Sequence, residues 1–107
     1  MTAVTANALG PLALARKAGK LELGEEPVGA ACRGRQARLV LLAADAAENT
    51  AAKAQRLAKA ANARCVRIPS NKEELGNALG RSSCAVLALT DEGFAKALCR
   101  KLEEEAP

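Results

Sequence analysis

Four cysteines are the side chains with the greatest potential for chemistry in this sequence. Cys32, Cys65, Cys84 and Cys99 lie 33, 19 and 15 residues apart, with no Cys-x-x-Cys pair and no histidine in the chain. Zinc sites are built from closely spaced cysteines or from cysteine with histidine, so no metal centre is expected. Each cysteine stands beside Ala, Val or Leu, which predicts reduced thiols that serve as small core residues.

Three pairs of carboxylates are the next candidates, because carboxyl groups can act as general acids and bases. Glu25–Glu26, Glu73–Glu74 and Asp91–Glu92 each fall in the first turn of an expected helix, where they complement the helix dipole or cap it. The chain also lacks Tyr, Trp, a glycine-rich nucleotide loop and a histidine to activate a cysteine nucleophile. The sequence therefore predicts no enzyme, no catalytic residue and no cofactor.

The remaining chemistry is recognition by loops that lead from strands into helices. Gly24–Pro27, Ala44–Glu48 and Thr90–Gly93 each join an expected strand to a helix N-terminus. Because free N–H groups and the helix dipole favour anions there, the three loops are expected to face one ligand, with phosphate as a candidate. Ordinary, well-capped turns are the alternative that the residues leave open.

The elements that hold these loops follow from hydrophobic patterning and from the positions of glycine and proline. Apolar stretches at 39–44, 65–68 and 84–89 predict buried strands, and residues 21–23 predict a short fourth. Amphipathic stretches predict helices at 7–18, 25–33, 51–61, 71–79 and 92–103, with residues 45–50 supplying caps for the third. This alternation predicts an α/β fold, a three-layer α/β/α sandwich with a small mixed four-stranded sheet.

Length, composition and charge agree with a single domain over residues 1–107. Of these residues 26 are alanine, which favours helices packed closely on a small sheet. The net charge is +4; residues 1–72 hold 12 Lys or Arg and 5 Asp or Glu, whereas residues 73–107 hold 4 and 7. This imbalance suggests a basic face for a polyanion.

No long apolar run and no basic N-terminal start are present, so no membrane partner, no secretion signal and a cytoplasmic location are expected.

Five segments stand out for their order and spacing. They are Leu9–Leu21, Ala37–Ala43, Glu48–Thr50, Lys72–Gly80 and Thr90–Leu98. Together they resemble the bacterial YlxQ-like branch of the ribosomal L7Ae/L30e family, over residues 9–102. The resemblance implies an α/β/α sandwich that binds RNA, typically a sharply bent kink-turn. It also implies a translation-associated protein whose partners are structured RNA, such as ribosomal RNA or a kink-turn, and ribosomal or translation proteins.

The resemblance further implies that RNA is gripped by the start of the second helix and by the loop before the last helix. The family pattern Gly-x-Asn-Glu-x-x-Lys falls here on Gly24, Glu26, Pro27 and Ala30, of which only the glycine matches. Basic residues are expected to form one face beside Gly24, and Leu89 to offer an apolar surface to unstacked bases. The expected RNA-binding residues are Lys20, Gly24, Glu25, Glu26, Arg33, Arg35, Arg38, Asp45, Leu89, Thr90 and Asp91.

Two classes of function therefore remain open from the sequence. The first is a non-enzymatic protein that recognises structured, kink-turn-like RNA. The second is a protein–protein interaction module of the same fold that has lost kink-turn recognition. The departures from the family pattern at Glu26, Pro27 and Ala30 favour the second class.

Overall fold

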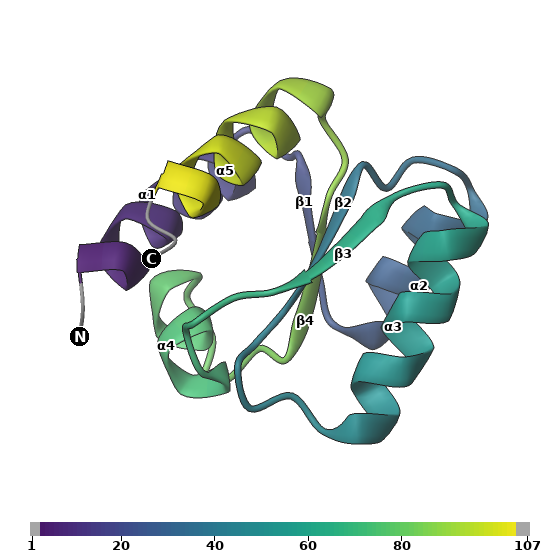
Figure 1. Ribbon diagram of the computed structural model, residues 1–107, viewed down its shortest axis with the longest axis horizontal. Helices are drawn as coiled ribbons and strands as arrows, with labels where there is room; N and C mark the ends of the chain where they lie inside the picture. Colours follow the sequence, from purple (N-terminus) through teal and green to yellow (C-terminus); the bar gives the residue numbers. More distant parts are fainter. Residues whose placement is uncertain (1–2, 105–107) are drawn as a thin grey trace.

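Helices and strands alternate along the chain (Figure 1). The computed structural model describes residues 3–104, with side chains from residue 10 to residue 103. The elements are α1 (Ala3–Lys17), β1 (Leu21–Leu23), α2 (Glu25–Arg33), β2 (Leu39–Leu42), α3 (Glu48–Ala60), β3 (Arg64–Arg67), α4 (Lys72–Ala78), β4 (Val86–Leu89) and α5 (Glu92–Glu104). The predicted order is confirmed, although α1 begins before the predicted start and holds Pro11 in its interior.

The sheet is mixed and has the strand order β1-β4-β2-β3. β2 pairs in parallel with β3 and antiparallel with β4, and β1 pairs antiparallel with β4. β1, β2 and β3 therefore run in one direction and β4 runs in the other. Every residue of the two central strands, β2 and β4, is buried, as their apolar sequences predict. The predicted mixed four-stranded sheet is confirmed.

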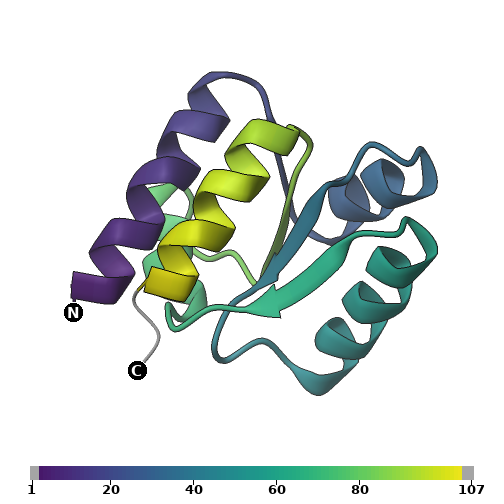
Figure 2. The same cartoon turned by 45° about the horizontal axis from the view of Figure 1, so that its top comes forward.

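Two helical layers enclose this sheet, with α2 and α3 on one face and α1, α4 and α5 on the other (Figures 1 and 2). Successive side chains of a strand point to opposite faces, so Leu39 and Leu41 enter one core whereas Val40 and Leu42 enter the other. On the α2–α3 side the core is rich in alanine, whose small side chain lets a helix lie close to the sheet. The predicted three-layer sandwich is confirmed.

Capping residues set the starts of α4 and α5. Asn71 and Glu74 form a reciprocal capping box at α4, in which each side chain accepts a bond from the other residue's N–H, at 2.8 and 2.9 Å. Asp91 Oδ2 accepts a bond from the N–H of Phe94 at 3.0 Å and caps α5. The predicted side-chain cap of α3 is wrong, since this helix begins after Ala47 without one.

The four thiols are all free, and two of them are core residues as predicted. Cys32 and Cys84 are buried in the two cores, whereas Cys65 and Cys99 are half-buried at their margins. Within residues 3–104, every helix is too short or too polar to cross a membrane.

Candidate functional site

The loops of the sheet leave from two opposite ends. Leu42, the last residue of β2, pairs with Val86, the first residue of β4. The loops after β1 and β2 therefore lie at one end, together with the loop that leads into β4, and the loop after β4 lies at the other. We call these the Gly24 end and the Thr90 end, after the residues that follow β1 and β4.

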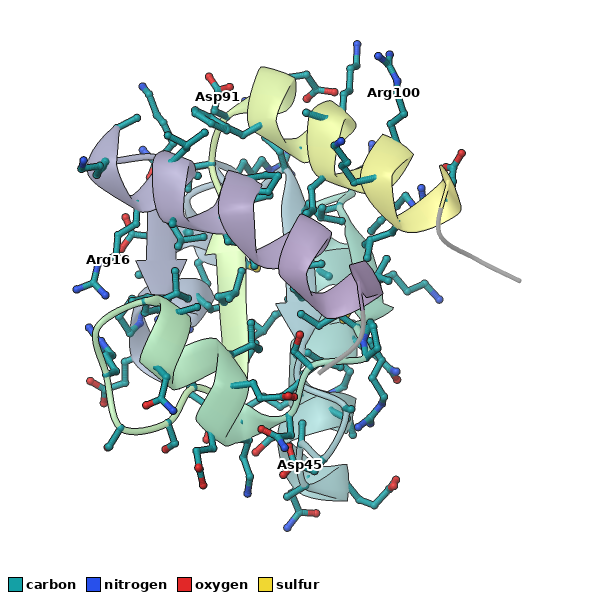
Figure 3. The ribbon with its side chains drawn as sticks, turned by 90° about the vertical axis from the view of Figure 1, so that its left-hand side faces the viewer. Arg16, Asp45, Asp91 and Arg100 are labelled. Carbon is teal, nitrogen blue, oxygen red and sulfur yellow. The ribbon has the colours of Figure 1, made fainter. Side chains whose placement is uncertain are left out.

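The residues predicted to bind RNA are divided between these ends. Figure 3 shows the separation, with Asp45 at one end of the molecule and Asp91 at the other. The prediction that all three strand-to-helix loops face one ligand is therefore wrong, because β4 runs antiparallel to its neighbours. Gly24, Glu25, Glu26 and Asp45 lie at the Gly24 end, and Lys20, Arg35, Arg38, Leu89, Thr90 and Asp91 lie at the Thr90 end. Arg33, in the last turn of α2, directs its guanidinium back beside Gly29.

At the Gly24 end, α2 begins without a side-chain cap. Gly24 adopts a φ of 97°, which favours glycine, and its N–H donates to the carbonyl oxygen of Val86 at 3.0 Å. This bond fixes the start of α2 against β4. Glu25 and Glu26 follow in the first turn and are exposed, and Pro27 occupies a position where its missing N–H is not needed. The helix N-terminus is therefore open to a ligand and is bordered by two carboxylates.

The loop from α4 to β4, residues 79–85, packs beside this helix start. Gly80 has a φ of 78°, and the N–H of Arg81 donates to the carbonyl oxygen of Gly76 at 2.7 Å. Further along, the N–H of Cys84 donates to the carbonyl oxygen of Lys72 at 2.9 Å. These bonds hold the loop on α4 while Arg81, and the two serines that follow it, remain exposed.

Two arginines converge on this junction from separate elements. The Arg16 guanidinium lies against this loop, since a Cβ placed on Gly80 would stand 3.6 Å from Arg16 Nη1. Burial raises the pKa of the Cys84 thiol, and the positive charges of Arg81 and Arg16 act in the opposite direction. The Cys84 thiol donates to the carbonyl oxygen of Val86 at 3.4 Å, the same oxygen that accepts the Gly24 N–H. Arg16 reaches from α1 toward the loop. Both arginines are exposed and supply positive charge beside the open start of α2.

The loop after β2 holds Asp45 in a structural role. Asp45 Oδ1 accepts a bond from the N–H of Lys72 at 2.8 Å, so this carboxylate caps α4 rather than the predicted α3. The guanidinium of Arg67 donates to the carbonyl oxygens of Ala43, Ala44 and Ala46 at 3.3, 3.0 and 3.3 Å. The loop is thus tied to both β3 and α4.

At the Thr90 end, a shallow polar hollow lies between the loops before β1 and β2. It is lined by Gly19, Lys20, Glu22, Gln36, Arg38 and Thr90. The N–H of Thr90 donates to the carbonyl oxygen of Lys20 at 3.0 Å, which ties the loop after β4 to the loop before β1. Arg38 Nε lies 4.0 Å from Glu92 Oε2, so part of its charge is offset. The predicted basic face beside Gly24 is therefore wrong, because its members Lys20 and Arg38 line this hollow instead.

Two residues at the Thr90 end that were predicted to bind RNA, Leu89 and Asp91, have structural roles instead. Leu89 is 1% exposed and belongs to the core between the sheet and α1, so the prediction that it contacts unstacked bases is wrong. The reason is that helices cover both faces of β4, which leaves no apolar strand surface open to a ligand. The Asp91 carboxylate is engaged in capping α5.

Arg81 is the residue of the Gly24 end that the sequence-based prediction missed. The run Gly80-Arg81-Ser82-Ser83 between an expected helix and strand was the available signal, because glycine and serine mark an exposed turn that presents the cation between them. Its position beside Gly24 depends on the direction of β4.

Among residues 3–104, no cluster of His, Cys, Asp and Glu side chains is arranged to hold a metal ion.

Comparisons with known proteins agree on one protein family. The sequence model of the ribosomal protein L7Ae/L30e/S12e/Gadd45 family matches residues 6–99. The chain is 37% identical to the RNA-binding protein YlxQ of Bacillus subtilis (strain 168), covering 86% of this chain and 91% of that protein. It is 35% identical to the RNA-binding protein YlxQ of Enterococcus faecium, covering 83% and 84% of the two chains. A solved structure of a Bacillus halodurans protein of unknown function superposes with a TM-score of 0.83 and 30% identity, covering 90% of this chain and 96% of that one.

Proposed function

Since the chain belongs to the ribosomal protein L7Ae/L30e/S12e/Gadd45 family, we propose that it is a non-enzymatic protein that binds structured, kink-turn-like RNA in the cytoplasm, in association with the ribosome or the translation apparatus. The names of its two Bacillus subtilis and Enterococcus faecium relatives, both RNA-binding proteins, support the RNA partner. The fold alone would not, because one fold can serve several functions.

The observation that carries the proposal is the position of Arg16 against Gly80, next to Arg81 in the exposed α4–β4 loop, at the end of the sheet where α2 begins without a side-chain cap. Guanidinium groups donate to phosphate oxygens in a planar, bidentate geometry, and helix N–H groups add further donors. The three donors come from three different segments of the chain. A sharply bent RNA backbone brings several phosphates close together and matches such a cluster better than a straight duplex does.

The carboxylates of Glu25 and Glu26 give this site its selectivity for bases. A carboxylate repels phosphate but accepts hydrogen bonds from the amino groups of bases. Arginine contacts to phosphate therefore position the RNA, while the exposed acids at the helix start contact base edges that the bend opens.

A gel-shift titration tests the proposal, with a kink-turn RNA and a plain duplex of equal length, each at about 50 and 200 mM salt. We expect the kink-turn to bind more tightly than the duplex at both salt concentrations. Equal, weak binding that disappears at the higher salt would reject kink-turn recognition and favour a protein-interaction module of the same fold.

A further inference from the structure

A groove runs between β3 and α5, starting at Glu92 near the Thr90 end of the sheet. Two adjoining hollows form it; β3 contributes Arg64 and Val66, and α5 contributes Cys99 and Leu102. α5 packs on α1 and β4 rather than on β3, and Figure 2 shows it lying beside α1. The layer of α1, α4 and α5 therefore leaves the β3 side of the sheet partly uncovered, and Val66 is only half-buried.

The outer edge of β3 borders this groove and is open. β3 is the last strand of the sheet, and no other strand within residues 3–104 pairs with its outer side. The N–H of Ile68 donates to the carbonyl oxygen of Leu42, so the alternation of the strand directs the backbone groups of Cys65 and Arg67 outward. An unpaired strand edge is a template for an added strand.

The groove combines an apolar floor with a basic rim. Val66, Cys99 and Leu102 are half-buried and form the floor. Arg64 Nη1 lies 3.7 Å from Cys99 Sγ, which places this guanidinium over the floor. The exposed side chains of Lys96 and Arg100 stand on the α5 side, and Figure 3 shows Arg100 directed away from the fold.

The charges of the rim indicate what kind of strand can be added. The cations are Arg64, Lys96 and Arg100, against the acids Glu92 and Glu103. Of these acids, Glu92 also lies near Arg38. Since Arg64 lies on the groove side of β3, pairing with the β3 of a second copy would bring two copies of this cation close together. An acidic strand would instead meet opposite charges.

We propose that the β3–α5 groove binds an extended acidic peptide segment of a protein partner, which adds a strand to the outer edge of β3. Its apolar side chains pack on Val66, Cys99 and Leu102, and its carboxylates meet Arg64 and Arg100. This inference is independent of RNA binding at the Gly24 end, because the two surfaces share no residue.

The test is a titration of the ¹⁵N-labelled chain, followed by NMR and amide hydrogen exchange, with an acetylated heptapeptide of alternating glutamate and valine. We expect shifts in β3 and α5 and slower exchange at the amides of Cys65 and Arg67. The double variant Arg64→Glu/Arg100→Glu should weaken binding about tenfold. The matched variant Lys53→Glu/Arg56→Glu, with the same charge change on the exposed face of α3, should bind as the parent does.

Two comparisons on the parent chain decide the question even if the charge-reversed variant does not fold. A heptapeptide with lysine in place of glutamate should not bind, and equal binding of both peptides would overturn the proposal. A uridine heptanucleotide should leave the β3 and α5 amides unchanged. If it shifts them as the acidic peptide does, or if the acidic peptide shifts Gly24 and Arg81 instead, the groove is not a site for an acidic protein segment.

Discussion

Ser83 lies directly against the backbone of Gly76, so that a Cβ placed on Gly76 would stand 2.5 Å from the Cα of Ser83 and 2.6 Å from its nitrogen. The close approach presses the α4–β4 loop onto α4, where the N–H of Arg81 reaches the carbonyl oxygen of Gly76. One glycine in a short helix thus positions the loop that presents Arg81 at the Gly24 end.

Replacing this glycine should displace the loop. We expect Gly76→Ala to destabilise the protein by about 1–3 kcal/mol, because the clash is with backbone that cannot rotate away. Urea unfolding measures this loss, and RNA titration should show weaker binding as Arg81 moves. Gly10→Ala is the control, since nothing lies within 4 Å of its Cβ position and alanine should stabilise α1 by about 0.5–1 kcal/mol. An equal effect of both substitutions would contradict the packing argument.

The two ends of the sheet give different expectations for charge reversal. Arg16→Glu and Arg81→Glu should each weaken kink-turn binding several-fold and reduce the salt dependence by about one phosphate contact. Lys20→Glu and Arg35→Glu, at the Thr90 end, should have smaller effects. Gel-shift titrations at several salt concentrations compare the four variants. Larger losses of kink-turn affinity for Lys20→Glu and Arg35→Glu would indicate that RNA binds at the Thr90 end.

Ala30 offers a gain-of-function test. It is exposed on α2, where the family pattern places a lysine. We expect Ala30→Lys to strengthen kink-turn binding several-fold, because lysine suits a helix and adds a cation beside the site. The ratio of kink-turn to duplex affinity is the measurement. A rise that is equal for both RNAs would indicate only nonspecific attraction.

Asp45 should contribute to stability rather than to binding. Asp45→Ala removes the acceptor of the Lys72 N–H and should cost about 0.5–2 kcal/mol in the free energy of unfolding. Urea unfolding tests this, with exposed Glu73→Ala as the control. Kink-turn affinity at a temperature where the variant remains folded should stay near that of the parent, and a loss as large as that of Arg81→Glu would assign Asp45 to the RNA site.

The buried thiols predict a loss of stability at alkaline pH. Burial raises the pKa of Cys32, Cys65 and Cys84, so the folded state holds these protons more tightly than the unfolded chain does. These thiols contribute to the free energy of unfolding at pH values below the ordinary thiol pKa of about 8.5. The contribution is lost as the pH rises through the pKa values of the thiols in the folded state. Urea unfolding at about pH 7 and pH 10 measures the free energy of unfolding at each pH. Between the two pH values this free energy should fall less for Cys32→Ala/Cys84→Ala than for the parent. An unchanged fall would exclude these thiols as its source.

Local sequence patterns were enough to predict which segments become helices and strands. Apolar stretches, capping residues and glycines act over a few neighbouring residues, so β2, β4, the Asn71 capping box and the Asp91 cap could all be read locally. The family resemblance, carried by segments in order, also predicted the layers correctly. The start of α3 was missed because Asp45 bonds to Lys72, 27 residues away, rather than to its own helix.

Which loops meet depends instead on how the strands pair in the folded sheet. β4 pairs antiparallel with both neighbours, and that direction moves the Thr90 loop away from Gly24 and brings the Gly80–Ser83 loop to it. Strand direction depends on pairing between segments far apart in the chain, which no local pattern specifies. The same packing buries Leu89 and brings Arg16 to the loop that holds Arg81, because burial and charge clustering are properties of the assembled layers.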